Sequence, residues 1–75
     1  MPQAFIMVDI MPGHERAVQQ AIQRLPGVKF AYQVTGGHDL IAFIDAEPYD
    51  ELALTVANIR TTPGVADTDT QLVLR

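Results

Sequence analysis

Two short polar segments of this sequence have residue types and spacing that could bind a small molecule. The first is Gly36-Gly37-His38-Asp39, which lies between two apolar segments. Glycines expose backbone N–H groups that can donate to a carboxylate, and Asp39 could pair with an ammonium group. Together these groups suit a zwitterion such as a free amino acid. The alternative is a plain hairpin turn, in which glycine allows positive φ and Asp39 bonds to nearby backbone.

The second polar segment lies near the end of the chain, in a stretch that alternates like a strand. Alternation separates two sets of side chains: Thr68, Thr70 and Leu72 on one side, and Asp67, Asp69 and Gln71 on the other. These hydroxyl and amide groups could line a pocket between subunits. The alternative is a solvated edge strand, where threonine is favoured and charge limits aggregation.

The sequence offers little for catalysis or metal binding. It contains no Ser/His/Asp spacing, no Walker loop and no GxGxxG. There are no cysteines, and the two histidines, His14 and His38, lie far apart, which makes a weak case for a metal site. Asp9 and Asp45 sit near expected strand ends without a nucleophile beside them. We therefore expect no enzymatic activity, no metal and no cofactor.

Length and composition indicate one small domain that associates with other subunits. The chain has 75 residues, of which 48% are hydrophobic, and a net charge of -4. A domain of this size has a modest core, so association is a natural source of further stability.

The five basic residues of the chain are scattered, which disfavours direct nucleic-acid binding. No apolar run is long enough to span a membrane and no signal peptide is visible, so we expect a cytoplasmic protein.

The order of periodic segments predicts a ferredoxin-like fold. Strand-like alternation covers 4–10, 28–34, 40–45 and 65–74, and helical spacing covers 14–25 and a segment that begins at Pro48. A Pro-Gly pair follows each helix, in LPGV at 25–28 and TPGV at 62–65. The pattern is a split βαβ unit, βαββαβ, of the α+β class. Right-handed crossovers then place both helices on one face of a four-stranded antiparallel sheet.

The other face of this sheet is expected to form a dimer. In the first three strands, both alternating sets of side chains include large apolar residues. One set packs against the helices, and the other would leave an exposed apolar patch in a monomer. Packing two such faces together buries it, at about 25 cal/mol per Å² of apolar surface, and association entropy offsets part of that gain.

The sequence resembles the C-terminal effector-sensing domain of the Lrp/AsnC family, also called the RAM domain. The V-T-G-x-x-D loop is present at 34–39, followed by the apolar strand LIAFI, and P-G-V-x-x-T-x-T is present at 63–70. The resemblance covers nearly the whole chain, as a single domain over 1–75. It implies dimers built by sheet packing, further assembly into rings that are commonly octamers, and small effectors, usually amino acids, bound between dimers.

The resemblance also implies a set of effector-binding residues. Gly36, Gly37, His38 and Asp39 match the effector loop of the family. The segment of the last strand that helps form the same pocket is matched by Thr68, Thr70, Gln71 and Leu72. Tyr49, at the start of the second helix, lies near a position implicated in effector response. In this sequence the loop contains Gly-His where many members have an acidic and an aromatic residue, so the effector itself stays open.

The full regulators of this family carry an N-terminal helix-turn-helix domain. This chain begins directly at the first strand, so it resembles the stand-alone form and is not expected to bind operator DNA. Its partners could include full-length regulators that share the fold. Two other interpretations stay open. One is a small dimeric enzyme, such as a cofactor-free monooxygenase or isomerase using His38 and Tyr32, and the other is an assembly domain without a ligand.

Overall fold

The computed structural model describes residues 2–75 and confirms the predicted βαββαβ order. Its elements are β1 (Gln3–Ile10), α1 (Glu15–Gln23), β2 (Val28–Gln33), β3 (Leu40–Asp45), α2 (Tyr49–Arg60) and β4 (Val65–Leu72). Several boundaries differ from expectation by one or two residues: β1 begins at Gln3 rather than at residue 4, α1 covers Glu15–Gln23 rather than 14–25, and β2 ends at Gln33 rather than at residue 34. Pro48 is the N-cap of α2 and lies outside the helix, and the last strand ends at Leu72 rather than at residue 74.

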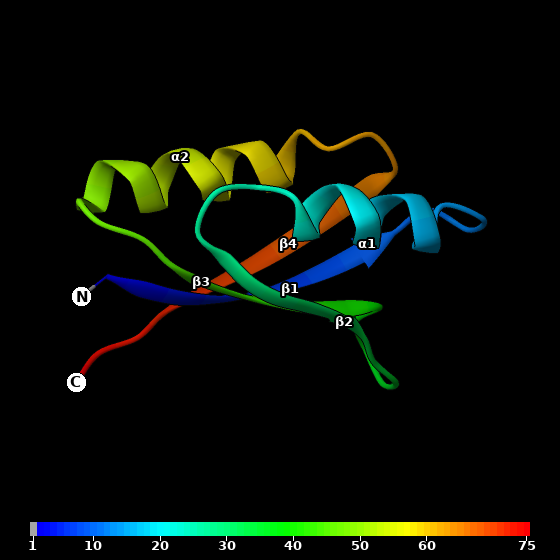
Figure 1. Ribbon diagram of the computed structural model, residues 1–75. Coiled ribbons are helices and arrows are strands. Elements are labelled where there is room, and N and C mark those ends of the chain that lie inside the picture. The colour runs from blue at the N-terminus through cyan, green and yellow to red at the C-terminus, as the bar shows by residue number, and fades with distance from the viewer. Residues whose placement is uncertain (1) are drawn as a thin grey trace.

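The four strands form one antiparallel sheet in the order β2-β3-β1-β4. Both helices cover the same face of this sheet, as the ferredoxin-like prediction requires (Figure 1). The strand β1 lies between β3 and β4, so β2 and β4 are the two edges. Neither helix of the described residues is long and apolar enough to cross a membrane.

The core lies between the sheet and the two helices. It is built from alternate residues of the central strands and from one apolar side of each helix. Buried side chains include Ile6 and Val8 of β1, Leu40 and Ile44 of β3, Val18 and Ile22 of α1, and Leu52 and Ile59 of α2. Thr55 of α2, the one buried polar residue among those described, donates from Oγ1 to the carbonyl of Pro26 at 2.8 Å. This bond ties α2 to the turn that follows α1.

The two Pro-Gly turns explain how each helix is followed at once by a strand. Gly64 has φ of +95°, and a Cβ placed there would lie 2.8 Å from Cγ2 of Val18. Gly27 holds the corresponding position in the first half, with φ of +82°. Both positions therefore need a residue that tolerates positive φ and occupies almost no space.

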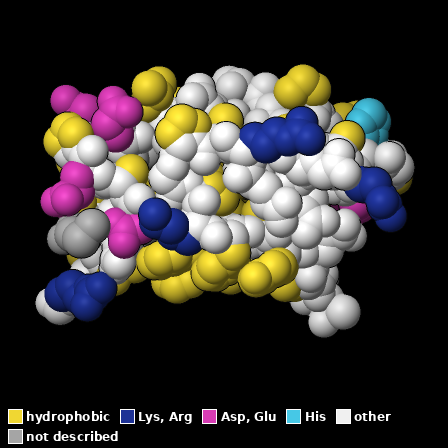
Figure 2. Space-filling view, viewed as in Figure 1, with side chains coloured by type: hydrophobic (Ala, Val, Ile, Leu, Met, Phe, Trp, Pro, Cys, Tyr) yellow, Lys and Arg dark blue, Asp and Glu magenta, His cyan; other side chains and the backbone are white. Residues whose placement is uncertain are grey.

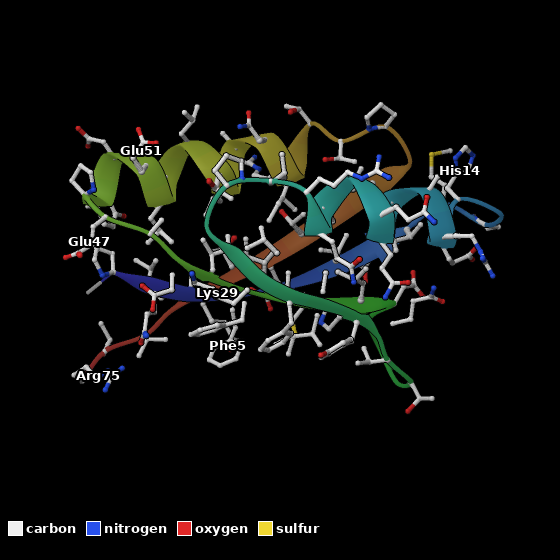
Figure 3. The ribbon with its side chains drawn as sticks, in the orientation of Figure 1. Phe5, His14, Lys29, Glu47, Glu51 and Arg75 are labelled. Carbon is white, nitrogen blue, oxygen red and sulfur yellow. The ribbon has the colours of Figure 1, made fainter. Side chains whose placement is uncertain are left out.

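The sheet face opposite the helices carries a continuous apolar surface, which we call the open face. The register places its side chains opposite one another on neighbouring strands, and Figure 2 shows hydrophobic side chains gathered below the sheet. In Figure 3, Phe5 points away from the helices on this side. The ring centroid of Phe43 lies 4.8 Å from that of Phe5 and 5.7 Å from that of Phe30. The open face comprises Phe5, Met7, Phe30, Tyr32, Ile41 and Phe43.

Candidate functional site

The Gly-Gly-His-Asp segment forms the tip and return of the loop that joins β2 to β3, here called the 34–39 loop. The amide of Val34 donates to the carbonyl of Asp39 at 3.0 Å and closes the loop. Gly36 has φ of +108°, whereas Gly37 does not have positive φ. A Cβ built on Gly37 would meet nothing within 4 Å. The space beside Gly37 is therefore free for an incoming group.

Asp39 fastens this loop to β1. Its amide donates to the carbonyl of Val8 at 3.0 Å, and its Oδ2 accepts from the amide of Ile10 at 2.8 Å. The sequence suggested either an ammonium partner or a bond to nearby backbone. The structure shows a backbone bond, but to a strand 29 positions away. It forms where the pairing of β1 with β4 shifts register, between Asp9 and Ile10.

His38 makes a second contact between the loop and the end of β1. Its Nδ1 lies 2.9 Å from Oδ1 of Asp9, and the two side chains are 40% and 36% exposed. Asp67 of β4 lies opposite Asp9 in the sheet. Sequence reasoning missed Asp9 and Ile10 as parts of the site, because no local motif links them to the loop. The pairing of β1 with β3 supplies that link.

The alternation predicted for β4 agrees with the observed register. Thr68, Thr70 and Leu72 lie opposite Val8, Ile6 and Ala4, which are buried under the helices. Gln71 lies opposite Phe5 and therefore belongs to the open face. The four candidate residues of β4 thus divide between two faces of the sheet.

Tyr49 and Leu72 come together in an apolar cleft of about 300 Å³, which we call the Tyr49 cleft. It is lined by Pro2, Gln3, Tyr49, Leu52, Leu72, Val73 and Leu74. The chain termini and the start of α2 lie at this end of the sheet, whereas the 34–39 loop projects from the opposite end (Figure 1). Within one subunit, the predicted residues of the 34–39 loop therefore lie apart from Tyr49 and Leu72. The other predicted residues, Thr68, Thr70 and Gln71, belong to neither group.

The chemistry of these groups is hydrogen bonding and apolar contact. Within residues 2–75, no three His, Asp or Glu side chains are grouped in a way that could hold a metal ion. The imidazole and carboxylate of His38 and Asp9 are paired at the surface and open to solvent, outside any closed cavity in which an acid–base pair would act on a sequestered substrate. What the geometry offers is a loop with exposed amides at one end and an apolar cleft at the other.

Comparison with known proteins identifies the domain. The Lrp/AsnC ligand binding domain model matches residues 3–75. Among curated proteins, homocitrate synthase of Sulfurisphaera tokodaii is 36% identical over 59 residues, covering 79% of this chain and 13% of that protein. The HTH-type transcriptional regulator FL11 of Pyrococcus horikoshii is 31% identical over 72 residues, covering 96% of this chain and 48% of the regulator. The chain thus spans less than half the length of these relatives.

A solved structure of similar size shows the same fold. The protein TTHA0845 from Thermus thermophilus is 34% identical, with a TM-score of 0.92, and the match covers 100% of this chain and 95% of that one. The AsnC protein of E. coli, at 22% identity and a TM-score of 0.87, shares the fold over 51% of its length. The chain therefore belongs to the Lrp/AsnC ligand binding domain family.

Proposed function

We propose that this chain senses a free amino acid, which binds between sheet-packed dimers and changes how those dimers associate. One observation carries the proposal. The 34–39 loop and the Tyr49 cleft contain six of the nine residues that the sequence predicts for the effector site, yet they lie at opposite ends of one subunit. Contact between subunits is what can bring the two groups to one ligand.

The open face supports a dimer formed by sheet packing. Large aromatic side chains bury about 150–250 Å² each, and four of the open-face residues are aromatic. At about 25 cal/mol per Å², covering this surface outweighs much of the entropy lost on association. Oδ1 of Asp45, beside the same face, is buried without a hydrogen-bond partner among the described residues. A donor from a second sheet would satisfy it.

The loop and the cleft have complementary chemistry for an amino acid. Exposed amides near Gly36 and Gly37 are suited to a carboxylate, and the space beside Gly37 is open. The Tyr49 cleft is lined mainly by apolar side chains and is suited to the aliphatic part of a ligand. An effector that contacts both groups would stabilise the assembled state by its differential affinity for that state.

Such a sensor would act by binding other proteins rather than by binding DNA directly. Most of the curated relatives are named as HTH-type transcriptional regulators, whereas this chain has a net charge of -4 and scattered basic residues. Co-assembly with full-length Lrp/AsnC regulators in the cytoplasm would connect effector binding to transcription. The homocitrate synthase relative makes an enzyme subunit a second class of partner to test.

Thermal-shift and calorimetric measurements against each of the common amino acids test the proposal. Gly37→Val is the informative variant, because its Cβ meets no neighbour in the subunit but would obstruct a ligand at the loop. We expect it to keep the circular-dichroism spectrum and to weaken binding at least tenfold. Ala53→Val, on the exposed side of α2, is the control. If no amino acid binds in any assembly state, the proposal fails.

A further inference from the structure

The two edge strands of the sheet, β2 and β4, differ in how far their outward-pointing backbone groups are already hydrogen-bonded. At the β2 edge, the carbonyl of Ala31 accepts from Nε2 of Gln19 at 2.9 Å and from Nε2 of Gln23 at 3.0 Å. Gln33 donates in turn to Oε1 of Gln19 at 2.9 Å. Side chains from α1 therefore occupy a backbone acceptor that another strand would need. This edge is closed to strand addition at its centre.

The β4 edge has backbone groups that point away from the sheet. The carbonyl of Val8 accepts from Asp39, on the β3 side of β1, whereas the carbonyl of Gln3 accepts from Val73, on the β4 side. Because bonding directions alternate along antiparallel strands, odd-numbered residues of β4 bond to β1. The even-numbered residues, Thr68, Thr70 and Leu72, direct their N–H and C=O groups outward.

One of these outward groups is already satisfied. The amide of Thr68 donates to Oδ1 of Asp67 at 2.9 Å. The side chain of Asp67 therefore blocks the β4 edge at Thr68. The outward groups of Thr70 and Leu72 remain on the exposed edge. Apolar side chains accompany them, since Leu72 is 47% exposed and Leu74 is 91% exposed. Both leucines line the Tyr49 cleft.

We propose that the β4 edges of two copies pair antiparallel about a twofold axis at Leu72, and that this pairing joins one sheet-packed dimer to the next. The proposal rests on the sheet-packed dimer of the proposed function. It places Leu72 opposite Leu72 of the partner subunit, Thr70 opposite Leu74 of the partner subunit, and Asp69 opposite Arg75 of the partner subunit.

Three properties of this register support it. All of the residues that would exchange backbone bonds are even-numbered, as the outward groups of β4 require. Asp69 and Arg75 are oppositely charged, and directly opposite positions of an antiparallel pair place their side chains on the same face. Within the subunit the guanidinium of Arg75, beyond the end of β4, donates to Oε1 of Gln3 at 2.6 Å, so the pairing would have to draw it towards Asp69 as well. Leu74, which has almost no cover in the subunit, gains a partner. A twofold axis at Thr70 would instead place Asp69 opposite Gln71, and Leu72 opposite Thr68 of the partner subunit, whose outward amide already donates to Asp67.

The edge pairing would also place the Tyr49 cleft at the contact between dimers. The sheet face and the β4 edge would be two different self-complementary contacts, and two twofold contacts on each subunit generate a closed ring of dimers when the rotation closes. The Tyr49 cleft lies beside Leu72, so the partner subunit's Leu74 would form part of its wall. A ligand in the cleft would then act directly on the contact between dimers.

The test measures the mass of the full chain by light scattering and native mass spectrometry over a range of concentrations. We expect wild type to form species larger than a dimer. Leu72→Lys introduces a charge at the twofold axis and should reduce the mass to that of the dimer. Leu54→Lys is the matched control, because Leu54 is 54% exposed on α2 and does not line the cleft. It should assemble as wild type does.

Charge reversal tests the register itself. Asp69→Arg and Arg75→Glu should each shift the assembly towards dimers, and the double variant should restore the larger species. If Leu72→Lys and both single reversals assemble as wild type does, or if wild type stops at the dimer, the edge pairing is wrong, whatever the amino-acid screen shows. If edge-dependent assembly is found but no amino acid binds, the edge pairing stands and only the proposed sensing function is overturned.

Discussion

His38, in the loop between β2 and β3, contacts Asp9 at the end of β1, with 2.9 Å between Nδ1 and Oδ1. The next residue, Asp39, contacts the same strand by accepting from the amide of Ile10 at 2.8 Å. Two consecutive side chains thus hold the candidate effector loop on one strand end. The His38 contact is solvated on both sides, whereas the Asp39 contact satisfies a backbone donor of a buried residue.

This difference predicts unequal effects on stability. Asp39→Ala leaves the Ile10 amide without its acceptor and should lower the free energy of unfolding by about 1–3 kcal/mol. His38→Ala removes a solvent-exposed pair and should lower it by less than about 1 kcal/mol. Urea denaturation of both variants measures the difference, and Asp39→Asn, which keeps an acceptor oxygen, serves as the control. A larger loss for His38→Ala than for Asp39→Ala would contradict this account.

Gly64→Ala should be strongly destabilising. The substitution combines a positive φ of +95° with a Cβ that would lie 2.8 Å from Val18 and 2.9 Å from His14, so strain of about 1–3 kcal/mol is joined by a steric clash in the core. Gly13→Ala is the control, because Gly13 has φ of +88° but a Cβ there meets nothing within 4 Å. Thermal unfolding should rank Gly64→Ala clearly below Gly13→Ala, and equal effects would show that the clash is relieved by relaxation.

Local sequence signals were sufficient for the fold. Alternation predicted the four strands, and the two Pro-Gly turns predicted the ends of both helices, because each signal depends on neighbouring residues only. The same alternation correctly separated Thr70 and Leu72 from Gln71. The helix start at Pro48 was off by one residue, because proline can serve as N-cap as well as first helical residue.

The site was less predictable because it depends on pairing between distant segments. Asp9 and His38 are 29 positions apart, and they meet because β1 and β3 pair in one register. The Tyr49 cleft forms where both chain ends meet the start of α2, which no motif marks. The sequence hypothesis placed the loop and Tyr49 in one effector site, and local patterns could not show that these residues lie at opposite ends of the subunit.

Phe43→Glu should separate the proposed sheet-packed dimer into monomers. Phe43 lies between Phe5 and Phe30 in the open face, so a carboxylate there would be buried without a partner on dimerisation. The fold should persist, because in the free subunit this face meets solvent. Sedimentation equilibrium measures the change, and Leu54→Glu on α2 is the control. Wild type that stays monomeric at high concentration would contradict the prediction at once.

Removing the glutamines that cover the β2 edge should expose that edge to other strands. In Gln19→Ala/Gln23→Ala, the carbonyl of Ala31 loses both of its side-chain donors, and we expect a loss of about 1–2 kcal/mol in unfolding free energy. A free acceptor at the centre of an edge also favours pairing between molecules. The double variant should therefore aggregate faster than wild type in light-scattering measurements. Gln20→Ala, at an exposed position of the same helix, should behave as wild type, and equal aggregation of both variants would show that the glutamines do not protect the edge.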